Sequence, residues 1–410
     1  MTRPTSGRRL AGIKSAALVL TGFCAGVVLT AAAGAVAKPR PNPYERLNTL
    51  GKVLSYIERS FVEPVDQQAL IDAGIKGMVS SLDPYSRWLT PQEHADLKRE
   101  YQGDFVGVGL ELSLKDAGLT VVTAIEGAPA AKAGARAGDI LMSINGVECR
   151  SWTPQKAIGK LRGPKGSEVD LVVARAGNSE AERRHELKVK RAVIQFDAVV
   201  HQTLSPGVGY IRLRAFQEGV VGDIEAILEA MKTTQPETKG LVLDLRNNPG
   251  GFFLEAVQVA DLFIDSGTIV TTTGRHEQQT EVFEARSDTT IFDLPLAVLV
   301  NENSASSSEL LAGALKDRGR AAIVGQKTFG KGTVQTFVDM KDGSALKLTT
   351  ARYLTPAQKP IEGKGIEVDI AVSQPVVVDF GGPDWQRQDV QLRMAHAHLK
   401  SISKMAGDKE

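Results

Sequence analysis

Apolar runs alternate with segments of helical spacing through the second half of the chain. The runs VGYIRL, GLVLDL, GTIVTT, PLAVLVN and AAIVG predict strands at 208–213, 240–245, 267–272, 295–301 and 321–325. Between them, apolar residues recur on one helical face around 223–232, around 254–263 and after Ser306. A β-rich stretch covers 333–355. Such alternation of strands and helices predicts an α/β core that begins near residue 191.

The region before this core shows short alternating strands and glycine turns. Strands are expected within 103–114, 119–125, 138–148 and 167–177, and helices at 128–135 and 153–162. The segment GDILMSINGV is a specific signal for a PDZ domain, which this region resembles. In such domains a glycine-containing loop offers backbone amides to a peptide's C-terminal carboxylate, and the next strand pairs with the peptide. The residues that match this loop are Val106, Gly107, Val108, Gly109 and Leu110.

Helical spacing also marks both ends of the chain. It predicts helices at 47–62 and 69–82, and Thr90 with Glu93 forms a capping box at the start of another helix. The segment 384–402 predicts a C-terminal helix that packs on these N-terminal helices. We therefore divide the chain into a leader at 1–37, an N-terminal helical region at 38–102, a PDZ domain at 103–190, a core at 191–375 and a C-terminal helical region at 376–410.

The first residues have the pattern of an export leader. Basic residues without an acid come first, and residues 15–37 are then uncharged up to Lys38. This pattern predicts either a signal peptide cut after Ala37 or an uncleaved anchor, because 23 residues are long enough to span a bilayer. Both alternatives predict export to the periplasm, and the second adds anchoring to the inner membrane.

Composition limits the classes of function. With 410 residues, 42% of them apolar and 24% charged, the chain is long enough for two or three folded domains. A net charge of +1 gives no electrostatic basis for binding nucleic acid. Cys24 lies in the leader, which leaves Cys149 without a partner for an internal disulfide. The six histidines form no cluster with metal-ligand spacing, so we expect neither a metal nor a cofactor.

The segment from Asn301 to Gln335 holds the candidate active site. A strand runs into a serine-rich turn that opens a helix, where unpaired amides favour the negative charge that develops in acyl transfer. A serine nucleophile needs a base, and no histidine lies in this segment. Lys331, between glycines, can serve if burial lowers its pKa and leaves the amine neutral. Gln335 follows four residues later in an expected strand, where residues four apart share a face, so its amide can orient the lysine.

These residues, together with DLRNNPGG at 244–251, resemble the carboxyl-terminal processing (tail-specific) proteases, which are serine peptidases with a Ser/Lys dyad. The resemblance implies that Ser306 is the nucleophile, Lys331 its base and Gln335 the residue that supports the base. It also implies a multidomain α/β and β protein, with a crotonase-like α/β protease core, an inserted PDZ domain and helical regions at both ends.

The resemblance has further implications for the site and its partners. One oxyanion donor would be the amide of Gly250 or Gly251, and the other that of Ser307. The substrates would be proteins or peptides with free apolar C-termini. An activating or adaptor protein and a homo-oligomer are both compatible with the family.

The choice of serine leaves alternatives open. Ser304, Ser307 and Ser308 are rival nucleophiles, because the family usually has alanine after the nucleophile and Ser307 stands there in this chain. The same cluster would also fit a plain helix start, in which Ser306 and Glu309 form a capping box.

Two other functions have some support in the sequence. The segment GQKTFGKG at 325–332 resembles a phosphate-binding loop, but Gly332 stands where a hydroxyl residue would bind magnesium, and a strand follows where a helix is needed. The remaining alternative is a periplasmic PDZ scaffold with a catalytically silent core. Loss of Ser306 or Lys331 would mark such a scaffold, and both residues are present.

Overall fold

The computed structural model describes residues 43–101, 104–115, 118–125, 127–175, 184–195, 197–204, 207–374 and 384–407. The chain divides into two compact units, Met1–Ile75 and Lys76–Glu410. Helix α2 (Pro43–Ser60) lies in the first unit, and α3 (Gln67–Ser80) begins there, as expected from the helical spacing. Within the described residues, no helix has the length and apolarity needed to cross a membrane. The leader predicted at 1–37 lies outside the described residues.

The region that resembles a PDZ domain contains an antiparallel sheet in the order β3-β4-β5-β7-β8, with β6 paired to β5. Its strands are β3 (Leu110–Lys115), β4 (Gly118–Ala124), β5 (Ile140–Ile144), β6 (Val147–Glu148), β7 (Glu168–Ala174) and β8 (Arg184–Lys190), and its helices are α5 (Pro129–Lys132) and α6 (Pro154–Leu161). Leu119, Val121, Leu141 and Val173 are fully buried between them. The expected strands and helices are therefore confirmed, and β3 lies at the edge of the described sheet.

The core contains a six-stranded sheet in the order β10-β11-β12-β15-β16-β19. Its strands are β10 (Val199–Leu204), β11 (Val208–Leu213), β12 (Gly240–Asp244), β15 (Leu296–Val300), β16 (Ala321–Gly325) and β19 (Ile370–Ala371). All pairs are parallel except β10 with β11. The central strands of such a sheet are buried on both faces, which explains why β11, β12 and β15 read as continuous apolar runs.

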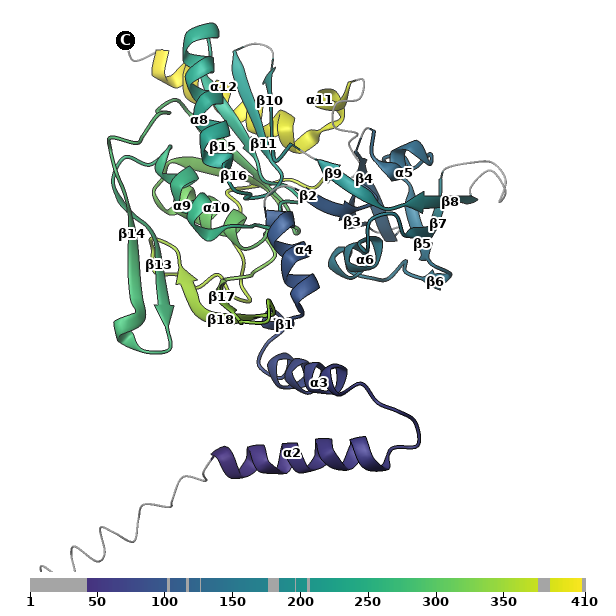
Figure 1. Cartoon of the computed structure of the whole chain (residues 1–410). Coiled ribbons are helices and arrows are strands. Elements are labelled where there is room, and N and C mark those ends of the chain that lie inside the picture. Colours follow the sequence, from purple (N-terminus) through teal and green to yellow (C-terminus); the bar gives the residue numbers. More distant parts are fainter. Residues whose placement is uncertain are drawn as a thin grey trace, which may run out of the picture. The chain divides into compact units, whose positions relative to one another are not determined.

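Helices cover both faces of this sheet (Figure 1). Leu241 and Leu243 face a cluster with α8 (Val220–Thr234), α9 (Phe253–Asp261) and α10 (Ser307–Asp317). Val242, between them, faces a second cluster with α11 (Trp385–Gln388) and α12 (Val390–Gly407). The α/β prediction is confirmed, while the crotonase-like relation stays a prediction. The prediction that the C-terminal helix packs on the N-terminal helices was wrong, because Leu392, Ala395 and Leu399 pack on the sheet.

A second, antiparallel sheet follows the order β1-β18-β13-β14, with β17 also paired to β18. Its strands are β1 (Arg87–Leu89), β13 (Gly267–Gly274), β14 (Thr280–Ala285), β17 (Thr333–Asp339) and β18 (Ala345–Leu354). A short 3-10 turn, η1 (Glu277–Gln279), precedes β14. Strands β2 (Asp104–Gly107) and β9 (Ala192–Gln195) form a separate pair where the chain enters and leaves the PDZ-like region.

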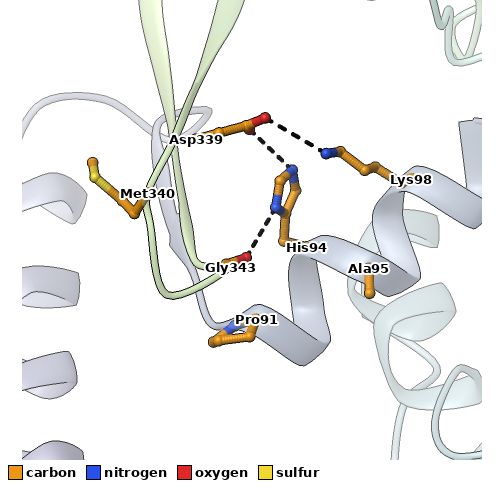
Figure 2. A pocket seen from close by; sticks show the side chains of 7 residues that line it. All are labelled: Pro91, His94, Ala95, Lys98, Asp339, Met340 and Gly343. Carbon is orange, nitrogen blue, oxygen red and sulfur yellow. Dashed lines mark hydrogen bonds and ion pairs between the residues drawn. The ribbon is translucent and has the colours of Figure 1, made fainter.

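Helix α4 (Pro91–Tyr101) holds the β17–β18 hairpin (Figure 2). Nδ1 of His94 lies 3.1 Å from the carbonyl oxygen of Gly343, and Asp339 lies 3.4 Å from Nε2 of His94 and 3.6 Å from Nζ of Lys98. Strand β1 pairs with β18 as well. Residues 87–101 therefore pack against the core, and they lie in the same compact unit, Lys76–Glu410.

Candidate active site

The candidate site lies where two neighbouring parallel strands end. Strands β12 and β15 are paired, and the loops that follow them contain DLRNNPGG and the serine cluster. The side chain of Asn301 joins these loops: its Oδ1 accepts the Asn247 amide at 2.9 Å and its Nδ2 donates to Asn247 Oδ1 at 2.8 Å. Ligand sites in α/β sheets form at such carboxyl ends, because the loops there converge.

Burial distinguishes Ser306 from the rival serines. The rivals are all buried, and their hydroxyls donate to backbone carbonyls: Ser304 to Leu245 at 2.8 Å, Ser307 to Gly251 at 3.0 Å and Ser308 to Asn248 at 2.9 Å. Ser306 is half-buried and lies at the N-cap of α10. Ser306 is thus the member of the cluster that stays partly exposed, and among the described residues no backbone carbonyl accepts its hydroxyl.

Ser306 has a strained backbone, with φ 58° and ψ −115°. A serine in such a conformation costs on the order of 1–3 kcal/mol and persists only where its surroundings hold it. Glu309 supplies one such restraint, because its Oε2 accepts the Ser306 amide at 2.9 Å. The expected capping pair is therefore present, and it fixes a sharp turn that presents the Ser306 side chain.

The carboxylate of Glu309 also binds the segment that contains Lys331. Oε2 accepts the Lys331 amide at 2.8 Å, and Oε1 accepts the Gly330 amide at 2.6 Å and the Thr328 hydroxyl at 2.5 Å. Glu309 is fully buried. A single oxygen thus connects the backbones of Ser306 and Lys331, which brings the two candidate residues together from separate elements.

The Lys331 side chain has the surroundings that a lysine base needs. Burial lowers its pKa below the ordinary value, and the negative charges of Glu362, Glu309 and Asp83 act in the opposite direction. Among the described residues, no carboxylate forms an ion pair with its amine. The ring centroid of Tyr85 lies 4.8 Å from Nζ. Desolvation without a direct counter-ion favours the neutral amine.

Gln335 lies close to this region, but the strand-face reasoning was wrong. Strand β17 begins at Thr333, so Lys331 precedes the strand and does not share its face. The Nε2 of Gln335 donates to Thr333 Oγ1 at 2.9 Å and reaches Thr349 Oγ1 at 3.4 Å. These contacts fix the amide group, and no described residue donates to its Oε1.

The structure separates the two glycines proposed as oxyanion donors. The Gly250 amide already donates to Asn248 Oδ1 at 2.8 Å, so it is occupied. For the amides of Gly251 and Ser307, no acceptor lies among the described residues. A Cβ on Gly250, which has φ +100°, would lie 2.8 Å from Ser306 Cβ. Gly250 therefore permits the close approach of the two loops, and Gly251 with Ser307 retains the free donors.

Tyr353 is a site residue that sequence reasoning missed. Its hydroxyl donates to the Lys331 carbonyl at 2.5 Å. Burial raises its pKa well above the ordinary value, the Glu309 charge raises it further, and a hydrogen bond with the Ser306 side chain acts in the opposite direction. A neutral phenol therefore contacts both candidate catalytic residues. Its only signal in the sequence was a place in a β-rich stretch.

The predicted peptide-binding loop lies between β2 and β3. Gly107 ends β2, Leu110 begins β3, Val108 and Gly109 form the turn between them, and Val106 precedes them in β2. The Val108 and Gly109 amides have no backbone acceptor among the described residues. Their carbonyls accept the Ala130 and Ile125 amides at 2.9 and 3.0 Å, so the turn is well held.

The strand after this loop contacts the core directly. Glu111, on β3, forms an ion pair of 2.7 Å with Arg212 on β11, whose side chain is fully buried. The edge strand that a peptide would join is thus connected to the sheet of the core.

A partly exposed serine, the nearby segment of a desolvated lysine and a PDZ-like region fit a serine peptidase with a PDZ domain, and the comparisons identify this class. The model of Peptidase family S41 matches residues 207–372, a PDZ domain model matches 120–175, and the model named "Activating protease CtpB N-terminal domain" matches 29–92.

A carboxy-terminal-processing protease of Bartonella bacilliformis is 36% identical over 92% of this chain and 87% of its own length. A probable CtpA-like serine protease of Staphylococcus aureus is 37% identical over 80% of this chain and 65% of its own. The chain belongs to peptidase family S41, as a carboxy-terminal-processing serine protease.

Solved structures extend the comparison to the fold. The photosystem II D1 C-terminal processing protease has a TM-score of 0.59 and 34% identity, with 82% of this chain and 90% of that chain covered. A putative S41 protease from Bacteroides fragilis, 15% identical over 86% of this chain and 97% of that chain, has a TM-score of 0.54 and shows likeness of fold alone.

Proposed function

We propose that this chain is an exported endopeptidase that engages substrate C-termini through its PDZ domain and cleaves by a Ser/Lys acyl-enzyme mechanism. The observation that carries the proposal is the shared Glu309 oxygen, which joins the turn of the accessible Ser306 to the segment of the desolvated Lys331. Catalytic roles for other groups in the site follow from their positions around this pair.

In the proposed reaction, Ser306 Oγ attacks the carbonyl carbon of the scissile peptide bond, and its proton passes to the neutral amine of Lys331. The amides of Gly251 and Ser307 bind the oxyanion of the tetrahedral intermediate. The C–N bond then breaks as Lys331 returns the proton to the leaving amine. Water hydrolyses the acyl-enzyme in the second half of the reaction, again with Lys331 as the base.

Gln335 is proposed to orient the lysine. Its Nε2 is held by Thr333 and Thr349, so its Oε1 is the atom left to accept a hydrogen bond from the Lys331 amine. A neutral amide does this without a negative charge that would raise the lysine pKa. The proposal thus keeps the role expected for Gln335, although a different backbone geometry provides it.

The PDZ domain is proposed to bind free apolar C-termini through the loop from Val106 to Leu110 and the open edge of β3. Export to the periplasm, with the leader either cut or kept as an anchor, is proposed from the basic residues and the uncharged run at 15–37. An activating or adaptor protein and a homo-oligomer are proposed as partners. Exposed apolar residues on α2, such as Leu47 and Leu50, support a helical partner there.

The proposed function is tested with purified protein and an unstructured protein substrate. Ser306→Ala should lose on the order of 10⁴-fold or more of the cleavage rate while it unfolds like the wild type. Ser308→Ala, which removes a buried hydroxyl from the same turn, should keep measurable turnover. Full activity in Ser306→Ala would refute the nucleophile assignment, and loss in Ser308→Ala alone would favour that rival.

A further inference from the structure

Tyr85 lies beside the candidate base although it comes from a distant part of the sequence. Its ring centroid is 4.8 Å from Lys331 Nζ, and the Tyr85 side chain is half-buried. Tyr85 lies in SSLDPYSRWL, where Asp83 and Pro84 favour a turn, and a turn alone would leave an aromatic ring in solvent. A ring at this distance removes water from one side of the amine.

The turn that holds Tyr85 is well ordered by its own hydrogen bonds. Asp83 Oδ1 accepts the amides of Tyr85 and Ser86, each at 2.7 Å, and Asp83 Oδ2 accepts the Ser86 hydroxyl at 2.7 Å. Pro84 lies between Asp83 and Tyr85 in the chain. The ring is therefore attached to a rigid turn and does not depend on a flexible loop.

This turn is also attached to the strand opposite Gln335. The Thr349 amide donates to Ser86 Oγ at 3.0 Å, and Ser86 is buried. Thr349 pairs with Gln335 between β17 and β18, and its Oγ1 lies 3.4 Å from Gln335 Nε2. Thr349 therefore contacts both the turn that holds Tyr85 and the side-chain amide of Gln335, which is proposed to orient the lysine.

We propose that Tyr85 is a positioning residue for Lys331: its ring covers the amine, excludes water from it and limits the directions in which it can point. The proposal rests on the proposed function, in which Lys331 is the base. It assigns a role in catalysis to the segment before β1, which the sequence pattern places in the N-terminal helical region.

An aromatic ring has two opposing effects on a lysine. It excludes water, which disfavours the ammonium form, and its π face attracts the ammonium, which favours that form. Burial is the dominant influence on the Lys331 pKa, which lies below its ordinary value. The groups that act on this amine are the ring of Tyr85 and the carboxylates of Asp83, Glu309 and Glu362, whereas the Tyr353 hydroxyl bonds the Lys331 carbonyl. All three carboxylates raise the pKa, so removal of the shielding ring weakens the burial that opposes them and should raise the pKa of Lys331.

The test is the pH profile of kcat/KM for Tyr85→Ala, Tyr85→Leu and Tyr85→Phe. In Tyr85→Ala, we expect the rise of kcat/KM with pH to shift to higher pH by about one unit, with about a tenfold loss at neutral pH that recovers in alkaline buffer. The Tyr85→Leu side chain still excludes water, so its rise should not shift to higher pH. Tyr85→Phe should restore the wild-type limb relative to Tyr85→Ala. If Tyr85→Ala does not fold, Tyr85→Gln gives the same comparison with a larger polar side chain.

Phe337→Ala is the matched control, because the ring of Phe337 also lies beside a lysine. The Nζ of Lys347 is 5.6 Å from the Phe337 ring centroid, and both residues lie on the β17–β18 hairpin. General loosening of the hairpin would shift the limb in this variant too, whereas a specific effect on Lys331 leaves it in place. A Tyr85→Ala profile that loses activity equally at every pH, or that superimposes on the wild type, overturns the proposal. Lys331→Ala separates the two levels: if it retains activity, the Ser/Lys mechanism itself fails.

Discussion

The backbone amide of Lys331 donates a 2.8 Å hydrogen bond to the buried carboxylate of Glu309. The same oxygen accepts the amide of Ser306, so one side chain fixes the spacing between the two segments of the candidate dyad. Burial raises the pKa of this carboxyl above its ordinary value, while hydrogen bonds from Thr328 and from the Lys331 amide lower it. The carboxylate has enough donors to remain the acceptor in this network.

Glu309→Gln should therefore impair both stability and catalysis. One carboxylate oxygen becomes an NH2 group that faces amide donors, which leaves buried groups unsatisfied and costs about 2 kcal/mol of unfolding free energy. We expect at least about a tenfold lower kcat, because Ser306 and Lys331 lose their common restraint. Denaturant unfolding and steady-state kinetics measure the two effects.

The control for this substitution is Glu93→Gln, because Glu93 caps α4 in the same way. Its Oε2 accepts the Thr90 amide at 2.8 Å, and within the described part of the chain no hydrogen bond connects it to the Lys331 segment. Glu93→Gln should keep the wild-type kcat. Equal losses in both variants would mean that Glu309 acts only as a helix cap.

Lys331 provides the second prediction, on pH. Because burial lowers its folded pKa, the neutral fraction of the amine rises as pH rises towards that value, and kcat/KM should rise with it and then level off. Lys331→Arg should be as inactive as Lys331→Ala at every pH, since a guanidinium does not release its proton. Near-normal turnover in Lys331→Arg would exclude lysine as the base.

The parts of the fold that the sequence predicted well are those with a strong local pattern. Strands β12 and β15 are buried on both faces, so they appear as apolar runs bounded by turn residues. Strands β8 and β14 were missed, because RHELKVK and TEVFEA carry charges on their exposed faces. The two-residue strand β19 has too few residues to form a pattern.

The candidate site was predictable only in part. Ser306 and Lys331 lie in short motifs, so their residue types and spacing were readable, but the burial that excludes Ser304 and Ser308 is a property of the folded turn. The occupied amide of Gly250 depends on the Asn248 side chain, which no spacing rule indicates. Tyr85 approaches Lys331 only because β1 pairs with β18, a contact between distant segments.

The last prediction concerns substrate selection by the PDZ domain. The Val108 and Gly109 amides are oriented by a turn whose carbonyls are already bonded, so they are suited to receive a terminal carboxylate. Amidation of the substrate C-terminus removes that charge and should weaken binding by about tenfold or more, because hydrogen bonds to a charged group are worth about 1.5–3 kcal/mol. Binding of a peptide that ends in free Ala-Ala and of its amide is measured on Ser306→Ala, which prevents cleavage.

Two glycine variants separate the loop from general effects on this domain. A Cβ on Gly109, with φ +79°, would collide with the side chain of Ala128, so Gly109→Ala should disturb the loop and reduce the preference for the free acid. Gly127 has a similar φ of +74°, and a Cβ added there would meet nothing within 4 Å, so Gly127→Ala should keep the preference.

On active enzyme, amidation of the substrate C-terminus should raise KM alone if the PDZ domain only tethers the substrate. It should also lower kcat if bound carboxylate acts on the core, to which the Glu111–Arg212 pair connects β3. Equal binding of acid and amide would show that this loop does not read C-termini.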